Sequence, residues 1–119
     1  MNSDNELVIN GITYIPKESK SGTFNGLEYK IVRTHSAGVF AGYLQSRNGQ
    51  EVILLKARRL WYWSGAASLS QLAEEGVSKP KECKFPQEVE KVELLQVVEI
   101  LDVTKKAQDN ISKISDWKE

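Results

Sequence analysis

Residues 39–63, VFAGYLQSRNGQEVILLKARRLWYW, decide the fold of this chain. Two runs rich in β-branched and aromatic residues flank the RNGQ sequence at 47–50. Asn-Gly is the pair that a tight hairpin turn favours, because both central positions need positive φ. The stretch therefore predicts an antiparallel hairpin with strands over 39–46 and 51–63. Gly42 has no side chain to pack, which predicts a bend, a bulge or a close approach by another backbone.

Similar patterns continue toward the N-terminus. Residues 6–16 place two short apolar runs around Asn10-Gly11 and predict a small hairpin. Residues 17–26 are polar and contain glycine, so they predict a loop. Residues 27–35, LEYKIVRTH, alternate between two faces and predict another strand. The central strands are therefore expected to span residues 27–63.

Toward the C-terminus the periodicity changes. Residues 66–75 predict a short helix that ends at Gly76, and residues 78–87 hold two of the three prolines and predict an irregular connection. Residues 104–114 predict a C-terminal helix capped by Thr104.

The stretch 88–103, EVEKVELLQVVEILDV, is ambiguous between two structures. Its branched valines favour strands, whereas its acids and leucines favour a helix. We expect a pair of strands here, with a helix as the alternative.

The composition places limits on the class of protein. A chain of 119 residues predicts one domain, residues 1–119. We expect an α+β, β-rich domain in which antiparallel hairpins form a small sheet or a partly open barrel. One short central helix and one C-terminal helix complete it.

The charges argue against a dedicated nucleic-acid binder, because 16 basic and 16 acidic residues give zero net charge. Their distribution is uneven: residues 36–63 carry a net +3 and residues 64–119 a net −3. A basic central hairpin that meets an anionic ligand or an acidic partner is one explanation, and ordinary surface variation is the other.

The single cysteine, Cys83, excludes an internal disulfide. The N-terminus shows no signal-peptide pattern, and no apolar run is long enough for a membrane helix. These features predict a cytoplasmic protein.

No catalytic centre is recognisable in the sequence. The only histidine, His35, and the only cysteine, Cys83, lie in no known nucleophile motif. Zinc-ligand spacings and phosphate-binding glycine loops are also absent from the sequence. We therefore expect a protein that is not an enzyme and needs no cofactor or metal.

One constellation stands out at residues 58–65, RRLWYWSG. Strict alternation would place Arg59, Trp61 and Trp63 on one face and Arg58 and Tyr62 on the other. Arginine forks match phosphates or carboxylates, and indole rings stack on bases or cations. The same residue types are enriched in protein-interface hot spots, and they also occur as core aromatics covered by arginine stems. All three interpretations remain open at this stage.

The stretch 33–77 resembles a family of small phage-encoded proteins described as domains of unknown function. The resemblance rests on the turn at 36–39, Gly42, Glu51-Val52, the run from Arg58-Arg59 to Trp63, and Gly65-Ala66. It extends more weakly to Trp117. The family implies no particular reaction, but small phage proteins often counter host defences. Some of them sequester nucleotide messengers, usually as homo-oligomers with pockets between subunits.

These observations predict a non-catalytic accessory protein of the phage type that binds and sequesters a small phosphorylated, nucleotide-like ligand. The ligand would be a host immune signal, bound at subunit interfaces in the host cytoplasm. The alternative is a protein–protein inhibitor or adaptor acting on a host or phage protein. The expected ligand-binding residues are Arg58, Arg59, Trp61 and Trp63, followed by Tyr62, Arg33 and Arg47.

Overall fold

The computed structural model describes residues 7–9, 12–14 and 21–119. Strands β1 (Leu7–Ile9) and β2 (Ile12–Tyr14) pair antiparallel, as the pattern over 6–16 predicts. The predicted turn at Asn10-Gly11 and residues 17–20 of the predicted loop lie outside the described residues.

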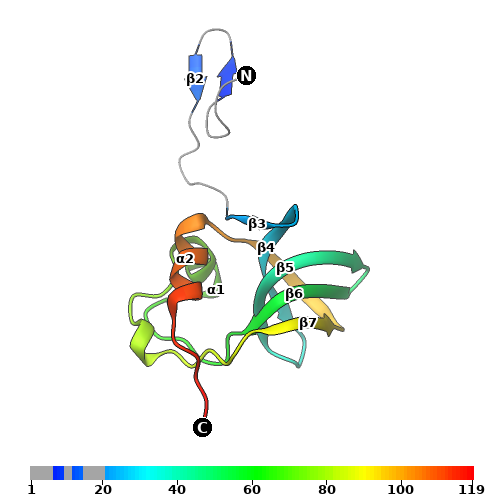
Figure 1. The fold of residues 1–119 in the computed structure, drawn as a ribbon, viewed down its shortest axis with the longest axis vertical. Coiled ribbons are helices and arrows are strands. Elements are labelled where there is room, and N and C mark those ends of the chain that lie inside the picture. Colours follow the sequence, from blue (N-terminus) through cyan, green and yellow to red (C-terminus); the bar gives the residue numbers. More distant parts are fainter. Residues whose placement is uncertain (1–6, 10–11, 15–20) are drawn as a thin grey trace.

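A curled antiparallel sheet forms the body of the protein (Figure 1). Its strands are β3 (Thr23–Phe24), β4 (Leu27–Thr34), β5 (Val39–Asn48), β6 (Glu51–Arg59), β7 (Val89–Leu94) and β8 (Val97–Asp102). The order is β3-β4-β5-β6-β7, and β8 also pairs with β4. Because β7 and β8 are joined by only Leu95-Gln96 yet pair with β6 and β4, the sheet must curl until its two edges approach each other. The predicted β-rich fold with a partly open barrel is confirmed.

The strands at 88–103 resolve the ambiguity in the sequence in favour of β structure. Their partners are distant in the chain: Val32 lies opposite Ile100, and Leu54 lies opposite Val92. The two strands are therefore neighbours in sequence but not hydrogen-bonded to each other in the sheet.

Two α-helices lie together on one side of the sheet, α1 (Leu69–Glu75) and α2 (Lys105–Lys113) (Figure 1). Helix α1 begins later than the predicted 66–75 because the Ser68 hydroxyl caps it, accepting from the Gln71 amide. Gly76, at φ 78°, ends it as predicted. Thr104 caps α2, also as predicted, and a short 3-10 helix, η1 (Pro80–Glu82), precedes β7. Among the described residues, no helix has the length and apolar character needed to cross a membrane.

The sheet is buried on both faces and so separates two apolar cores. All five long strands, β4 to β8, contribute to the core inside the curl. This core consists of Val32, Phe40, Val52, Leu54, Ala57, Leu94 and Val97. The core between the sheet and the helices includes Ile31, Leu60, Leu72, Phe85 and Ile111. Adjacent residues such as Ile31 and Val32 therefore serve different cores, which explains why the central strands have apolar residues on both faces.

A bulge in β6 overturns the predicted alternation over 51–63. Lys56 adopts a left-handed conformation, φ 49°, and one residue of β5 lies opposite two residues of β6 at this point. The phase of the side chains reverses there. Leu54 and Ala57 consequently share the inner core, and Arg58 turns toward the helices instead of sharing a face with Leu54.

Strand β6 also ends at Arg59 rather than at Trp63. Its partner β5 begins at Val39, and Leu60 N–H donates to the Val39 carbonyl as the last contact between the two segments (2.8 Å). Beyond it, Tyr62 makes only an isolated bridge with Lys84.

Gly42 lies opposite the bulge, and the predicted close approach of another backbone is confirmed. A Cβ atom at this position would lie 3.0 Å from both the Ala57 Cα and the Leu55 carbonyl oxygen.

We expect Gly42→Ala to lower the free energy of unfolding by about 1–3 kcal/mol, because the added methyl group must push β5 and β6 apart. The control is Gly22→Ala, whose Cβ would meet only Gln108 Oε1 at an ordinary 3.5 Å. Urea unfolding followed by fluorescence measures both variants. Equal midpoints for the two would show that the close approach does not constrain the sheet.

Candidate functional site

The arginines singled out in the sequence lie at separate places on the fold. Arg33 pairs with Glu99 of β8 (Nε–Oε1 2.8 Å), and Arg47 donates to the Gly49 carbonyl in the β5–β6 turn. Arg59 lies over the Phe40 ring, with its guanidinium carbon 4.3 Å from the ring centroid, and donates to the Ala37 carbonyl. These three side chains do not form one binding cluster.

Arg58 is buried, with 6% of its surface exposed, and its guanidinium makes five hydrogen bonds. Two go to the carbonyls of Ile111 (2.8 Å) and Ile114 (2.6 Å), at the end of α2. Two go to the Phe85 and Pro86 carbonyls ahead of β7, and one to the Asp116 carboxylate (3.2 Å). The side chain therefore ties the end of α2 and the C-terminal tail to the sheet.

The aromatic residues at 61–63 divide between surface and core. Trp61 is 64% exposed and Tyr62 51% exposed, whereas Trp63 packs against the core between the sheet and the helices. Since β6 ends before these residues, Arg59, Trp61 and Trp63 do not share a strand face.

A small three-segment sheet forms beside them. Tyr62 and Lys84 exchange backbone hydrogen bonds (3.2 and 2.8 Å), and Phe85 bridges to Asp116 in parallel. Residues opposite each other in a pair point to the same side, so Tyr62 and Lys84 share a face. The Lys84 ammonium also lies 5.6 Å from the centre of the Trp117 ring. We call Tyr62, Lys84 and Trp117 the aromatic–lysine row.

A groove of about 480 Å³ lies next to this row, between η1 and the C-terminal tail. Lys81 and Lys113 line it together with Trp117, and its one carboxylate, Asp116, is paired with Arg58. The groove therefore combines an indole with ammonium groups that form no ion pair within residues 21–119, which suits an anionic ligand that carries an aromatic ring. We call it the tail groove.

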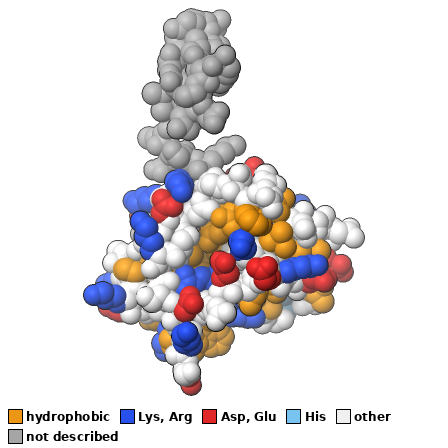
Figure 2. Space-filling model, in the orientation of Figure 1, with side chains coloured by type: hydrophobic (Ala, Val, Ile, Leu, Met, Phe, Trp, Pro, Cys, Tyr) orange, Lys and Arg blue, Asp and Glu red, His pale blue; other side chains and the backbone are white. Residues whose placement is uncertain are grey.

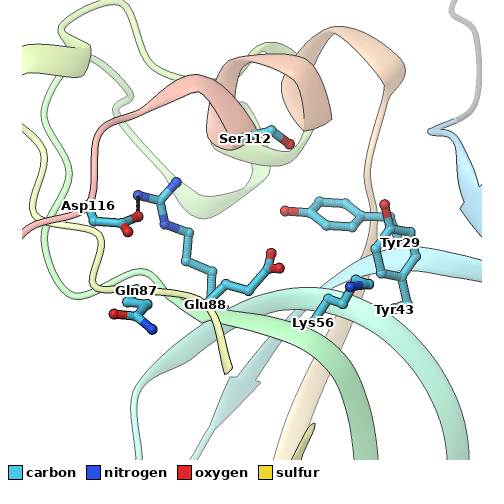
Figure 3. Close-up of a pocket in the computed structure, with 8 residues that line it drawn as sticks. Tyr29, Tyr43, Lys56, Gln87, Glu88, Ser112 and Asp116 are labelled. Atoms are coloured by element: carbon cyan, nitrogen blue, oxygen red, sulfur yellow. Dashed lines mark hydrogen bonds and ion pairs between the residues drawn. The ribbon is translucent and has the colours of Figure 1, made fainter. Parts of the chain in front are cut away.

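A second cavity, of about 460 Å³, lies between the sheet and α2, and we call it the helix-side pocket (Figure 3). It draws residues from β4, β5, β6, the segment before β7, α2 and the tail: Tyr29, Tyr43, Lys56, Arg58, Gln87, Glu88, Ser112 and Asp116. The sequence reasoning missed most of these. A signal that could have pointed to the pocket is Lys56, which directly follows the apolar run Val52–Leu55 of β6.

Tyr29 is the most deeply buried member of this pocket, with 6% of its surface exposed. Burial raises its pKa well above the ordinary tyrosine value, with further increases from Tyr43 and Glu88, so the phenol stays protonated and can donate a hydrogen bond. The Tyr43 hydroxyl accepts from Gln108 Nε2 (3.1 Å). No hydrogen bond to the Tyr29 hydroxyl is present within residues 21–119.

Two further chemistry-bearing residues are Cys83 and His35. Cys83 is buried and helps to line the tail groove, and its thiol lies near the Ser64 and Lys79 carbonyls. His35 is exposed after β4 and bonds to Gln96 through its backbone. Among the described residues, no group of three or more His, Cys, Asp or Glu side chains is placed to hold a metal ion.

Comparison with known proteins gave one match. A family model described as a domain of unknown function (DUF6948) matches residues 27–111, from the start of β4 into α2. No curated protein and no solved structure matches the chain.

We expect Arg58→Met to lower the free energy of unfolding by about 3–5 kcal/mol, because it leaves several carbonyls and a carboxylate without their buried donor. The neighbouring Arg59→Met is the matched control and should cost about 1 kcal/mol, since that side chain bonds one carbonyl at the surface. Thermal and urea unfolding measure the difference. Similar losses in both variants would contradict the role assigned to Arg58.

Proposed function

We propose a function for this chain, which belongs to the DUF6948 family of domains of unknown function: it binds and sequesters a small phosphorylated, nucleotide-like ligand without transforming it. The tail groove and the aromatic–lysine row are the proposed site. The observation that carries the proposal is the Lys84 ammonium lying over the Trp117 ring, beside a groove lined by Lys81 and Lys113.

The chemistry of the groove supports a ligand with separate aromatic and anionic parts. An indole face stacks on any nucleobase, and a stacked base contributes about 1–3 kcal/mol of binding free energy. Lysine ammonium groups bind phosphate oxygens as point charges. In the proposed complex the base lies against Trp117 or Tyr62, and the phosphates lie against Lys81, Lys84 and Lys113.

Arg58 acts in this proposal through Asp116 and not by contact with the ligand. Its guanidinium is occupied by four carbonyls and the Asp116 carboxylate. Pairing with Arg58 offsets the negative charge that would otherwise repel a phosphate from the groove. Arg33, Arg47 and Arg59 lie elsewhere on the fold and are not assigned to the site.

The biological setting follows from the resemblance to phage-encoded proteins. In that setting the protein acts in the host cytoplasm, and the sequestered ligand is an immune signal. Sequestration needs tight binding without turnover, and the cations and aromatic rings of the proposed site suit binding. Cys83 also lines the groove, but its buried thiol lies against the Ser64 and Lys79 carbonyls, and the Asp116 carboxylate is paired with Arg58.

We expect Trp117→Ala and Lys84→Ala each to weaken nucleotide binding at least tenfold, through lost stacking and lost charge. Lys106→Ala, which alters an exposed lysine outside the groove, should bind as the parent does. Native mass spectrometry with a nucleotide panel that includes cyclic species identifies the ligand, and titration gives the affinities. Binding should also weaken as salt rises.

Failure of the entire panel to bind the parent protein would refute the proposed ligand. Binding that survives Trp117→Ala unchanged would refute the proposed site. Release of a hydrolysed or cyclised product from a bound nucleotide would show that the protein is an enzyme.

Adjacent exposure of Trp61 and Tyr62 favours a second candidate function, docking of a protein partner. Large exposed aromatics of this kind anchor interfaces once a partner covers them. One candidate partner is a second copy of this chain, which would place the ligand site near a subunit interface. The other is a host or phage protein, toward which the chain acts as an inhibitor or an adaptor.

We expect Trp61→Ser to abolish this docking. Its free energy of unfolding should stay within about 0.5 kcal/mol of the parent value, as for other surface substitutions. Light scattering distinguishes the two partners: a multimer that dissociates in the variant identifies self-association. A monomeric parent that retains a stoichiometric host protein, which the variant loses, identifies the inhibitor function. A monomer that captures nothing would eliminate docking at Trp61.

A further inference from the structure

Tyr29 marks the helix-side pocket, the hollow between the helices and the sheet in Figure 2, as more than a packing defect. Its side chain is largely buried, and its hydroxyl has no hydrogen-bond partner within residues 21–119. Tyr29 is held between β5 and α2, and its ring packs edge-on against Tyr43, with centroids 5.1 Å apart. In Figure 3 its hydroxyl end points into the space between Ser112 and Glu88. Among the described residues no fully buried side-chain oxygen lacks a partner, so this hydroxyl is accessible from the cavity, where it can donate to a bound molecule.

Lys56 brings a positive charge to the same pocket at a cost in backbone conformation. Its φ of 49° lies in the left-handed region, which glycine occupies without penalty and other residues occupy reluctantly. The ammonium lies 5.0 Å from the centre of the Phe24 ring and forms no ion pair within residues 21–119. A long cationic side chain is thus found where the local geometry alone favours glycine.

Glu88 supplies the opposite charge. Its carboxylate lines the pocket, is close enough to Tyr29 to raise the pKa of that phenol, and has no ion-pair partner in the described part of the chain. Lys56 and Glu88 do not pair with each other across the cavity. The other charges on the wall, Arg58 and Asp116, already neutralise one another.

The pocket therefore offers one free cation, one free anion and one free hydroxyl donor among its described residues, with tyrosine rings between them. A phosphate would meet the Glu88 carboxylate, and a simple organic cation would meet the Lys56 ammonium. A molecule that carries both a carboxylate and an ammonium group matches both charges at once. Its carboxylate would accept hydrogen bonds from Tyr29 Oη and Lys56 Nζ, and its ammonium group would face Glu88.

From this arrangement we infer that the helix-side pocket is a second binding site, separate from the tail groove, and that it takes a small zwitterion of the α-amino acid class. A cavity of about 460 Å³ accommodates such a molecule together with water. The inference does not depend on the nucleotide proposal, because the residues that carry it line a different cavity.

The test uses the full chain and the common α-amino acids, each added alone at millimolar concentration. Amide chemical shifts of the ¹⁵N-labelled protein should move around Tyr29, Lys56 and Glu88 with at least one of them. The N-acetyl and the carboxamide forms of that same amino acid each remove one of its charges, and each should bind at least tenfold more weakly.

Tyr29→Phe is the decisive variant, because it removes the hydroxyl and keeps the ring. We expect at least tenfold weaker amino-acid binding with an unfolding midpoint close to that of the parent. Tyr62→Phe, which alters an exposed hydroxyl outside the pocket, is the control and should bind normally. Glu88→Gln should also weaken binding, whereas Glu90→Gln on the exposed part of β7 should not.

Several results would overturn the inference. They are a parent protein that responds to no α-amino acid, a Tyr29→Phe variant that binds as the parent does, and an N-acetyl derivative that binds equally well. Trp117→Ala must leave amino-acid binding unchanged, so the outcome stays distinct from success or failure at the tail groove.

Discussion

The Arg58 guanidinium is the interaction on which the arrangement of both cavities depends. It binds the last carbonyls of α2, the carbonyls ahead of β7 and the Asp116 carboxylate, so the acceptors come from two segments, 85–86 and 111–116, that are distant in sequence from each other and from Arg58. A planar group with five N–H donors suits this task, and a lysine would satisfy fewer of the acceptors. Burying the charge is tolerable because its N–H groups meet carbonyl dipoles and a carboxylate instead of water. The position of the tail, and with it the tail groove, follows from this contact.

The bulge at Lys56 determines where that guanidinium points. Without the extra residue, alternation would direct Arg58 into the core inside the curl, where its guanidinium would meet apolar side chains instead of carbonyl acceptors. With it, Ala57 takes the inner position and Arg58 faces α2. Gly42 makes the bulge possible, because the backbone of β6 approaches β5 more closely there than any side chain would allow. The same bulge projects Lys56 beside Phe24 and so creates one wall of the helix-side pocket.

Local patterns predicted the elements of this fold better than their consequences. The β5–β6 hairpin, the Thr104 cap of α2, the stop of α1 at Gly76 and the β structure over 88–103 follow from turn chemistry and residue preference within a few positions. The separation of β7 from β8 in the sheet is a property of the curl as a whole, so no local sequence pattern predicts it. Strict alternation failed at a single left-handed lysine, Lys56, and the face predicted for Arg58 was therefore wrong: its side chain is buried against the end of α2. The helix-side pocket was not predicted from the sequence because its lining residues come from six segments of the chain.

Both cavities are lined by Asp116, which is paired with Arg58, and they differ in how firmly their walls are held. The helix-side pocket lies largely between elements fixed by the sheet and by the four carbonyl contacts of Arg58. The tail beyond Ile114 is held by the Asp116 ion pair, by Trp117 N–H donating to the Phe85 carbonyl (2.9 Å), and by Lys84 over the indole. Contacts of these kinds each contribute about 0.5–1.5 kcal/mol. A ligand in the tail groove therefore meets a wall that it can adjust, whereas a ligand in the helix-side pocket meets one that is already formed, so the second site should discriminate more sharply between close chemical relatives.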